Sequence, residues 1–389
     1  MSEFELGAHV EEFRAGVRGF LAEHLTDEVR EHEWRTGDGH NWVFHRALAA
    51  RGWAFPTLPV DEGGPGLDDY CRFVLLQELY LAGAPLVGWN TTQMPATVIR
   101  QLGSAAQREI LREIASGDAI ICLGFTEPDS GSDVAAAKTR AVRDGEGWIV
   151  SGQKMFTTLA HLAQYCFLLT RTNTEVAKHR GLTVFLVPLD APGIEIQPVR
   201  TTAGERTNIV FYNDVVIPDA ARLGEIDGGW SVMNATLGIE HANASFWGVK
   251  QRLFNAALQA ARSTTDGSGR TLLDHPINRE RLARAAVHNE VALLMGYRSA
   301  WQASQSIHST VDGPITKLFA TETFIADASE FMDMLGPGSL PAFRDPGGDD
   351  SSLVEFLYRY SFGTTIYGGS SEVMRGIVAE QGLGLPRSR

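Results

Sequence analysis

The hydrophobic period of this 389-residue chain changes twice, and this change limits its fold more than any other feature. Up to about residue 117, apolar residues recur at steps of three and four, which is typical of amphipathic helices. Between 118 and 226 the period falls to two, in short runs bounded by Gly, Pro, Asn and Asp, which predicts strands. From 227 to 389 the helical period returns. We therefore predict an α+β fold, mainly α, with an N-terminal helical domain (1–117), a central β-barrel domain (118–226) and a C-terminal four-helix-type bundle (227–389).

These periods also place individual elements. The strands are expected at 119–123, 147–152, 165–170, 182–187, 194–199 and 208–217. In the C-terminal part we expect one long helix over 230–262, followed by helices over 276–309, 314–334, 353–362 and 370–381. In the N-terminal part the stripe begins with Phe13, Val17 and Phe20, and two short helices are expected at 95–102 and 105–115.

Composition argues against several classes of partner. The net charge of −13, without a basic patch, disfavours nucleic acid and anionic membranes. No run approaches the roughly 20 apolar residues of a membrane span, and the acidic first residues lack the layout of a signal peptide. Cys71, Cys122 and Cys166 are widely spaced, so neither a disulfide framework nor a zinc site is expected. We expect a soluble cytoplasmic protein without a metal ion.

One loop combines a proline, two glycines, two serines and three acids in ten positions, directly after an apolar run. Glycine permits close backbone approach, and Ser and Asp side chains bond nearby backbone groups. Such a loop exposes many N–H and O–H donors, which suits a polar planar ligand. A turn-rich hairpin loop without a ligand is the alternative. The loop is Gly124-Phe125-Thr126-Glu127-Pro128-Asp129-Ser130-Gly131-Ser132-Asp133.

The order of residues in this loop resembles the flavin-binding signature of acyl-CoA dehydrogenases. The succession of helices, a small β-domain and a helical bundle is similar to that family along nearly the whole chain. The resemblance implies FAD, held by backbone and hydroxyl groups of Leu123, Phe125, Thr126 and Ser132. Donors at these places would stabilise the negative charge that a reduced flavin accumulates. A Rossmann domain has no support, because no G-x-G-x-x-G fingerprint is present.

A second motif lies at Gly152 to Thr158. In the resembling family an aromatic residue and a nearby hydroxyl residue cover one face of the flavin, and Phe156 and Thr158 occupy these positions here. Phenylalanine replaces the commoner tryptophan, which keeps the stacking surface but lacks the indole donor. Taken alone, Phe156 would be better explained as a core residue of a strand; together with the first motif, the flavin position is favoured.

Dehydrogenation of a thioester needs a carboxylate that takes the α-proton, and an apolar site makes it a stronger base. The family places this glutamate either in a late Tyr-Glu-Gly motif or in the long helix. Here the late motif has Gly368, whereas Glu240 occupies the helix position. The resemblance therefore implies Glu240 as the base. The backbone N–H of Gly368 would still polarise the thioester carbonyl, and glycine would leave room for a bulky acyl group.

Helical spacing supports Glu240 independently. It lies on one apolar stripe with Met233, Leu237 and Trp247, at three- and four-residue steps. A lone acid on such a stripe is either a paired structural group or a functional one. His241 replaces the arginine usual in the family and points about 100° away on an ideal helix.

Two segments depart from the family pattern. Residues 265–274 lack its usual Arg-x-x-Phe-Gly motif, and Asp333 stands where a glutamine is expected. Both motifs normally reach the flavin of a neighbouring subunit, and an acid near a pyrophosphate is unfavourable. Segments 178–181 and 201–204 are similar to the base-carrying subunit of heterotetrameric bacterial dehydrogenases that degrade steroid side chains. The resemblance implies a second homologous subunit (α2β2), with a homo-oligomer left open.

The resemblance thus predicts an FAD-dependent acyl-CoA dehydrogenase that forms a trans-2-enoyl-CoA and passes electrons to an electron-transfer flavoprotein. A bulky steroid side-chain CoA thioester is the expected substrate. Two alternatives stay open: a catalytically silent subunit that shares the flavin of an active partner, and a flavin oxidase of the same fold. The sequence leaves open the acyl chain, the partner, the acceptor and the role of His241.

Overall fold

The structure is a computed structural model that describes residues 6–242, 245–307, 309–339 and 350–386; the side chains of 237–242, 338, 339 and 350 lie outside this description. The chain forms two compact units, each assembled from separated segments. The helical unit comprises 1–25, 68–84 and 240–389, and the sheet unit comprises 26–67 and 85–239. The sequential division at 117/118 and 226/227 stays a prediction, since each unit takes segments from more than one of the predicted domains.

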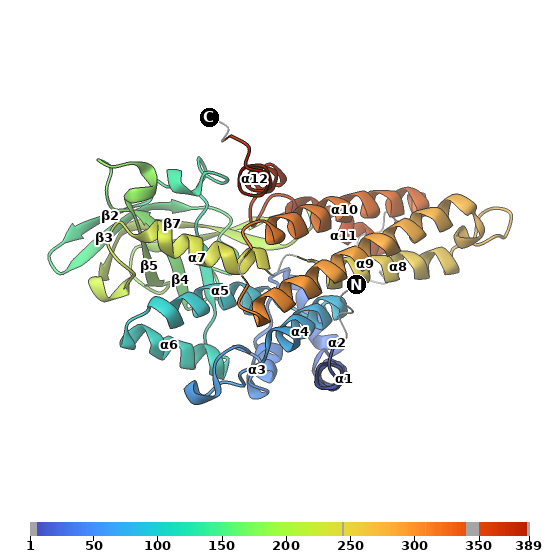
Figure 1. Cartoon of the computed structure of the whole chain (residues 1–389), viewed down its shortest axis with the longest axis horizontal. Coiled ribbons are helices and arrows are strands. Elements are labelled where there is room, and N and C mark those ends of the chain that lie inside the picture. Colours follow the sequence, from blue (N-terminus) through green and yellow to red (C-terminus); the bar gives the residue numbers. More distant parts are fainter. Residues whose placement is uncertain (1–5, 243–244, 308, 340–349, 387–389) are drawn as a thin grey trace. The chain divides into compact units, whose positions relative to one another are not determined.

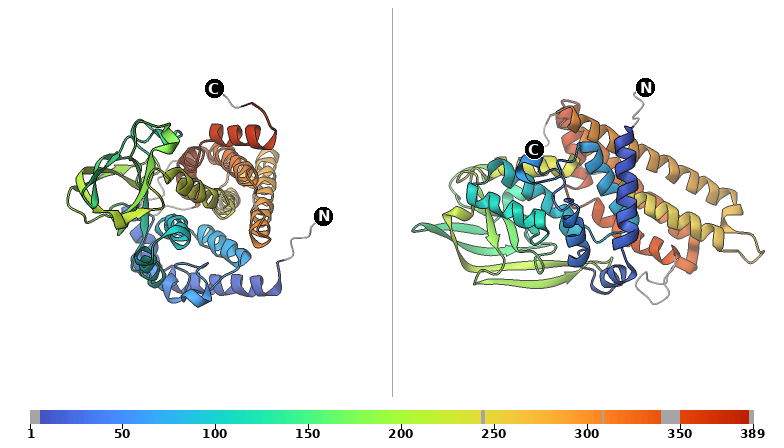
Figure 2. Two further views of the ribbon diagram at one scale, coloured as in Figure 1. Left: turned by 60° about the vertical axis from the view of Figure 1, so that its left-hand side comes forward. Right: turned by 90° about the horizontal axis from the view of Figure 1, so that it is seen from below.

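The sheet unit is built on eight strands in the order β6-β7-β3-β2-β4-β5-β8, with β1 paired in parallel to β4. Residues from β1, β3, β4, β5 and β7 meet in one buried cluster, and Figure 2 shows the strands curling around it. This arrangement agrees with the predicted β-barrel. The strands are β1 (Ile121–Gly124), β2 (Arg140–Asp144), β3 (Gly147–Lys154), β4 (Tyr165–Arg171), β5 (Leu182–Pro188), β6 (Ile194–Arg200), β7 (Arg206–Pro218) and β8 (Arg222–Leu223).

The six strands predicted from the sequence are confirmed, whereas β2 and β8 were not predicted. In β2 the only buried side chain is Ala141, and its other residues are exposed, so the strand has almost no apolar alternation. Its position is set by pairing with β3 and by a single parallel bridge from Arg140 to Arg171 of β4.

Helices cover a second face of the sheet unit. A buried cluster joins Ile99 and Ile114 on the helices to Phe167 and Val184 on the strands. The helices are α2 (Asp27–Thr36), α3 (Trp42–Ala50), α5 (Val87–Leu102), α6 (Ala105–Ser116) and most of α7 (Gly229–Ala242). The predicted start of a helix at residue 95 is wrong, because α5 begins at Val87 and contains Pro95. The turn before this proline is held by hydroxyl groups: Thr92 Oγ1 donates to Gly88 O (2.7 Å).

Two histidines are buried at the N-terminal end of α3. His40 and His45 are 1% and 2% exposed, and their ring centroids lie 4.9 Å apart. Among the described residues, none of their four ring nitrogens has a hydrogen-bond partner. Burial lowers the pKa of His40 to about 3, with a contribution from His45, and that of His45 to about 4. Both imidazoles are therefore neutral at physiological pH.

The helical unit contains the long helices at the C-terminal end of the chain and two from its beginning (Figure 1). Its core includes Leu253, Phe324, Phe331 and Val354. The helices are α1 (Ala8–His24), α4 (Asp69–Ala82), α8 (Trp247–Ser263), α9 (Pro276–Ser304), α10 (Asp312–Leu335), α11 (Asp350–Thr364) and α12 (Ser371–Ile377), which continues as a π-helical turn (Val378–Gly382). The predicted bundle is confirmed, although α9 ends before the predicted residue 309. In the part of the chain that the structure describes, no helix is both long and apolar enough to span a membrane.

The single long helix predicted over 230–262 is wrong. The chain forms α7 and then a separate α8, and Phe246 before α8 has a left-handed backbone (φ 49°). The first turn of α8 is held by α4, since the Gly248 N–H donates to Gln77 Oε1 (2.8 Å). Gly248 also packs closely on α4: a Cβ atom there would lie 2.4 Å from Gln77 O and 2.7 Å from Tyr80 Cβ. Apolar period alone does not reveal this contact.

This packing predicts that Gly248→Ala destabilises the protein. Alanine normally favours a helix by ~0.5–1 kcal/mol over glycine, but here its methyl group would overpack the α4–α8 contact, at a cost of about 1–3 kcal/mol. We expect a lower melting temperature by circular dichroism. The matched control is Gly16→Ala on α1, where a Cβ would meet nothing within 4 Å; this variant should melt at or above the wild-type temperature. A Gly248→Ala variant that melts higher would contradict the predicted clash.

Candidate active site

The loop after β1 makes a tight turn around Pro128 and Asp129. The Glu127 N–H donates to Ser130 O (2.9 Å), and the Ser130 N–H donates to Glu127 O (3.1 Å). Two exposed ion pairs lie on the same segment, Asp129 with Lys138 (2.8 Å) and Asp133 with Lys178 (2.5 Å). The loop therefore has a defined conformation that does not depend on a ligand.

A buried ion pair fixes this loop to β3. Lys154, which is fully buried, donates from Nζ to Glu127 Oε1 (2.7 Å) and to Phe125 O (3.2 Å). The same carboxylate accepts the N–H groups of Lys138 (2.6 Å) and Thr139 (2.9 Å). These hydrogen-bond partners of the Glu127 carboxylate are all donors, as expected of an ionised group.

Opposing effects set the pKa of Glu127. Burial alone would raise it, but the Lys154 ammonium and the N–H groups of Thr139 and Lys138 outweigh burial, so the pKa of Glu127 lies below its ordinary value. Burial lowers the pKa of Lys154, and the Glu127 carboxylate opposes that shift. The carboxylate stays charged in the folded state and loses its stabilising role only when the pH falls through its lowered pKa.

The structure brings the second predicted flavin motif beside this loop. The Met155 N–H donates to Thr126 O (2.8 Å), so the residues that follow β3 start next to the loop. Phe156 has a left-handed backbone (φ 57°) and its ring is 55% exposed. A positive φ is unfavourable for a bulky residue, and exposure of a large ring is also unusual. Thr158 is half-buried, and its hydroxyl meets that of Thr207 (3.1 Å).

The residues of the sheet unit fit the flavin that the sequence predicts. Leu123 and Phe125 pack against the core, and the Phe125 ring meets Phe167 at 5.9 Å. Thr126 is half-buried and Ser132 is exposed; among the described residues, neither hydroxyl has a protein partner. The buried hydroxyls of Ser130 and Thr157 also lack one. Unused donors beside an exposed aromatic ring match a planar ligand with polar edges, such as an isoalloxazine.

Gly368 lies in the loop between α11 and α12, in the helical unit. Gly368 and Gly369 both have positive φ angles (66° and 90°), which glycine adopts without strain. The buried Lys317 of α10 donates from Nζ to Thr364 O (3.1 Å) and to Gly369 O (2.6 Å). Within the described residues the Gly368 N–H donates to no acceptor, so it is available to a substrate carbonyl.

The same unit holds the junction that follows Glu240. Phe246, just before α8, contacts the ring of Tyr367 (centroids 6.4 Å apart), the residue before Gly368. The Tyr367 hydroxyl meets that of Tyr360 at 3.1 Å. Glu240 itself belongs to α7, but its side chain, like that of His241, lies outside the described residues. The structure therefore places Phe246 beside the Gly368 loop and does not describe the position of the Glu240 carboxylate.

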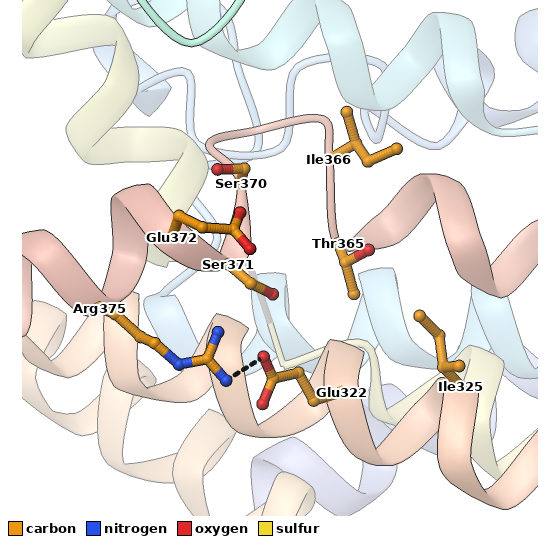
Figure 3. A pocket seen from close by; sticks show the side chains of 8 residues that line it. All are labelled: Glu322, Ile325, Thr365, Ile366, Ser370, Ser371, Glu372 and Arg375. Carbon is orange, nitrogen blue, oxygen red and sulfur yellow. Dashed lines mark ion pairs between the residues drawn. The ribbon is translucent and has the colours of Figure 1, made fainter.

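A pocket of about 390 Å³ opens beside this loop (Figure 3). Arg375 and Glu322 form an ion pair across part of it (2.6 Å). The Ser371 hydroxyl is buried, and no described group bonds to it. The pocket is lined by Glu322, Ile325, Thr365, Ile366, Ser370, Ser371, Glu372 and Arg375. The lining combines apolar side chains with hydroxyl and charged groups.

The sequence analysis missed three residues that organise these loops: Glu127, Lys154 and Lys317. Lys154 could have been found, because it follows Trp148 and Val150 at even spacing on the inward face of β3. A charged residue on an inward face needs a partner, and Glu127 is an acid in the neighbouring loop. Lys317 has no such signal, because the acceptors that link it to this loop, Thr364 O and Gly369 O, are backbone carbonyls.

One group of possible metal ligands occurs in the described residues, at the ends of α1 and α4. His9, Asp68 and Cys71 offer ligand atoms within 4.8 Å of one another. Asp68 Oδ1 accepts the Cys71 N–H (2.8 Å) as the cap of α4, and Oδ2 meets His9 Nε2 (3.1 Å). These contacts account for the grouping as a helix cap with an exposed pair.

Comparisons with known proteins agree with the family that the sequence resembles. Three family models match in succession: the N-terminal domain of acyl-CoA dehydrogenase at residues 8–118, the middle domain at 122–215 and the C-terminal domain at 227–383. The chain is 33% identical to acyl-CoA dehydrogenase IpdE1 of Mycobacterium tuberculosis, over 97% of this chain and 98% of that protein.

The chain is also similar to two solved structures. The Tcur3481-Tcur3483 steroid ACAD superposes with a TM-score of 0.89 at 31% identity, covering 99% of this chain and 100% of that one. The ChsE4-ChsE5 complex from Mycobacterium tuberculosis gives 0.88 at 32% identity, covering 99% of each chain.

The buried ion pair predicts that Lys154→Met destabilises the sheet unit by about 3–5 kcal/mol, because it leaves the Glu127 carboxylate buried without its cation. We expect a lower melting temperature and a lower flavin content after purification, measured by calorimetry and by flavin absorbance. The matched control is Lys138→Met, which removes a cation from an exposed pair on the same loop and should change little. Adding Glu127→Gln to Lys154→Met should recover part of the lost stability, because no buried carboxylate is then left without a cation. Unchanged stability in Lys154→Met alone would contradict the role of the pair.

Proposed function

Because this chain belongs to the acyl-CoA dehydrogenase family of flavin-dependent, FAD-binding oxidoreductases, we propose that it converts an acyl-CoA thioester into the trans-2-enoyl-CoA with Glu240 as the base. The observation that carries this assignment is the unused N–H of Gly368 in a loop that Lys317 holds from both sides. A fixed, unpaired N–H is what a thioester carbonyl needs when charge develops on its oxygen.

In this mechanism the carboxylate of Glu240 takes the α-proton of the thioester. The Gly368 N–H donates to the carbonyl oxygen, which gains negative charge as that proton leaves. FAD, when bound, accepts the β-hydrogen as hydride. Met233, a buried apolar residue two turns before Glu240 on α7, favours an acid with a raised affinity for protons; Trp247, expected on the same stripe, belongs to α8.

Residues of the sheet unit would hold the FAD. We assign backbone and hydroxyl donors of the loop, from Leu123, Phe125, Thr126 and Ser132, to the polar edge of the isoalloxazine. Phe156 and Thr158 would cover one of its faces. The exposed Phe156 ring and the unpartnered hydroxyls of Thr126 and Ser132 support this assignment. The Glu127–Lys154 pair holds the loop in position without needing to touch the ligand.

The substrate is proposed to be a bulky CoA thioester with a steroid side chain. Likeness to a steroid ACAD over the whole chain supports this class. Glycine at 368 and 369 leaves space beside the carbonyl site, because neither residue carries a side chain. An electron-transfer flavoprotein is the proposed acceptor of the electrons.

We also propose that the chain works with a second, homologous subunit in an α2β2 assembly that shares each flavin. The similar ChsE4-ChsE5 structure is a complex of two different chains. On α10, the side chain of Asp333 is 76% exposed and lies 4.0 Å from Arg281, and Glu330 one turn earlier pairs with Arg281 (3.2 Å) and Arg284 (2.7 Å). An exposed acid where glutamine is expected disfavours a pyrophosphate on this surface.

Glu240→Gln should retain bound flavin and lose about 10²–10⁴-fold in turnover, since the amide cannot accept the α-proton. The measurement is anaerobic bleaching of the flavin by a steroid side-chain CoA thioester, followed in a stopped-flow instrument. Glu290→Gln, which changes an exposed acid on α9, is the control and should bleach at the wild-type rate. Unchanged bleaching in Glu240→Gln would remove Glu240 as base and favour the silent-subunit alternative.

Co-expression with a homologous partner subunit should give one flavin per two chains. If each flavin needs residues of both subunits, the chain expressed alone should purify with much less flavin. Flavin absorbance against protein mass, with native mass spectrometry, measures both ratios. One flavin per chain in a homo-oligomer of this protein would rule out the shared site.

A further inference from the structure

We infer that Lys317 is a positioning residue for catalysis: it clamps the Gly368 loop so that the Gly368 N–H faces the thioester carbonyl. This inference rests on the proposed function, because it concerns the same carbonyl site. Lys317 does not touch the substrate in this proposal. It acts through two backbone carbonyls that lie on either side of Gly368.

Lys317 is 3% exposed and extends from α10 to the neighbouring loop. Its Nζ atom donates to Thr364 O (3.1 Å) and to Gly369 O (2.6 Å). Thr364 is the last residue of α11, and Gly369 directly follows Gly368. One ammonium group therefore connects the end of α11 to the residue after Gly368. It fixes the distance between these two carbonyls.

The N–H groups on either side of the turn are bonded. Those of Ile366 (3.0 Å) and Tyr367 (3.1 Å) donate to Gly363 O, and the Ser371 N–H donates to Thr365 O (3.0 Å). Among the described residues, the N–H groups of Gly368, Gly369 and Ser370 have no acceptor. The turn therefore presents three consecutive unused N–H groups, as expected of a preformed donor site, and the Gly368 N–H is the one that the family resemblance assigns to the carbonyl.

The backbone conformation needs this clamp. Consecutive left-handed residues, Gly368 and Gly369, have many accessible conformations in an isolated chain, and glycine loses much entropy when it is fixed. The bond from Lys317 to Gly369 O selects one of these conformations.

A simpler role for Lys317 is to cap α11, since cations commonly bond the last carbonyls of a helix. The two roles differ in what they do to a bound thioester. A cap alone stabilises the fold, whereas a positioning residue also stabilises the enolate form of the ligand. The test must therefore measure enolate binding separately from stability.

The experiment compares the holoenzyme with its Lys317→Met variant. The probe is acetoacetyl-CoA, a small thioester whose α-proton is acidic enough to leave near neutral pH; its enolate is followed by absorbance. We expect the variant to bind the enolate about tenfold more weakly or worse, which corresponds to ~1.4 kcal/mol. Amide hydrogen exchange over residues 365–371 should accelerate in the same variant, and kcat should fall more than KM rises.

The matched control is Lys250→Met. Lys250 is another buried lysine of the helical unit, but it donates to Asp327 Oδ2 (3.0 Å) and Thr323 Oγ1 (3.0 Å) on α10 and, among the described residues, makes no hydrogen bond to the Gly368 loop. This variant should lose stability and keep its affinity for the enolate. Lys317→Arg keeps the charge in a different shape and should recover part of the enolate binding.

Two outcomes would overturn the inference. If Lys317→Met speeds amide exchange but leaves enolate affinity unchanged, Lys317 is only a helix cap. If wild-type holoenzyme does not favour the enolate at all, the proposed carbonyl site fails, and the inference with it; that failure is recognised because it occurs without any substitution. Should Lys317→Met not fold, Lys317→Gln decides: an enolate affinity equal to wild type together with faster amide exchange over residues 365–371 would also overturn the positioning role.

Discussion

The ion pair between Glu127 and Lys154 is the interaction on which the flavin loop depends. Moving two charges out of water costs several kcal/mol for each ion, and attraction alone repays this only when hydrogen bonds satisfy both groups. Here the carboxylate accepts two backbone N–H groups, and the ammonium also reaches Phe125 O. The pair therefore connects three backbone segments at the end of β3. By fixing the loop, it also fixes the positions of the exposed donors of the loop.

Buried lysines also connect separate segments elsewhere in the chain. Lys317 joins two carbonyls around Gly368, and Lys250 joins α8 to Asp327 of α10, which also meets His288 Nδ1 (2.7 Å). A lysine has a long stem that crosses apolar packing and a head that needs several acceptors. Such a residue connects groups of separate segments through directional hydrogen bonds. Apolar contacts lack this directionality.

Much of the fold follows from hydrophobic period, because one face of most strands and helices is buried. The six regular strands and the bundle were predictable for this reason, and the loop and glycine motifs indicated the cofactor. The hydrophobic period could not reveal β2, in which Arg140 and Arg143 are exposed. It could not reveal the break before α8 either, because that break depends on the contact of Gly248 with α4. It also could not identify Lys317, because the bonds from Lys317 to Thr364 O and Gly369 O are to backbone atoms. Of the predicted site, the assignment of Glu240 still rests on sequence alone.

The three cysteines have a practical consequence. Cys71 lies in the helical unit, whereas Cys122 and Cys166 face each other on β1 and β4 of the sheet unit, and all three thiols are free and buried. Burial raises the pKa of Cys71 to about 12, so its thiol stays protonated and is nearly inert while the surrounding structure is folded. A thiol reagent can modify these residues only when the surrounding structure opens. The chain thus carries a natural reporter in each unit, and the labelling rates of Cys71 and of the Cys122–Cys166 pair would give separate opening free energies for the two.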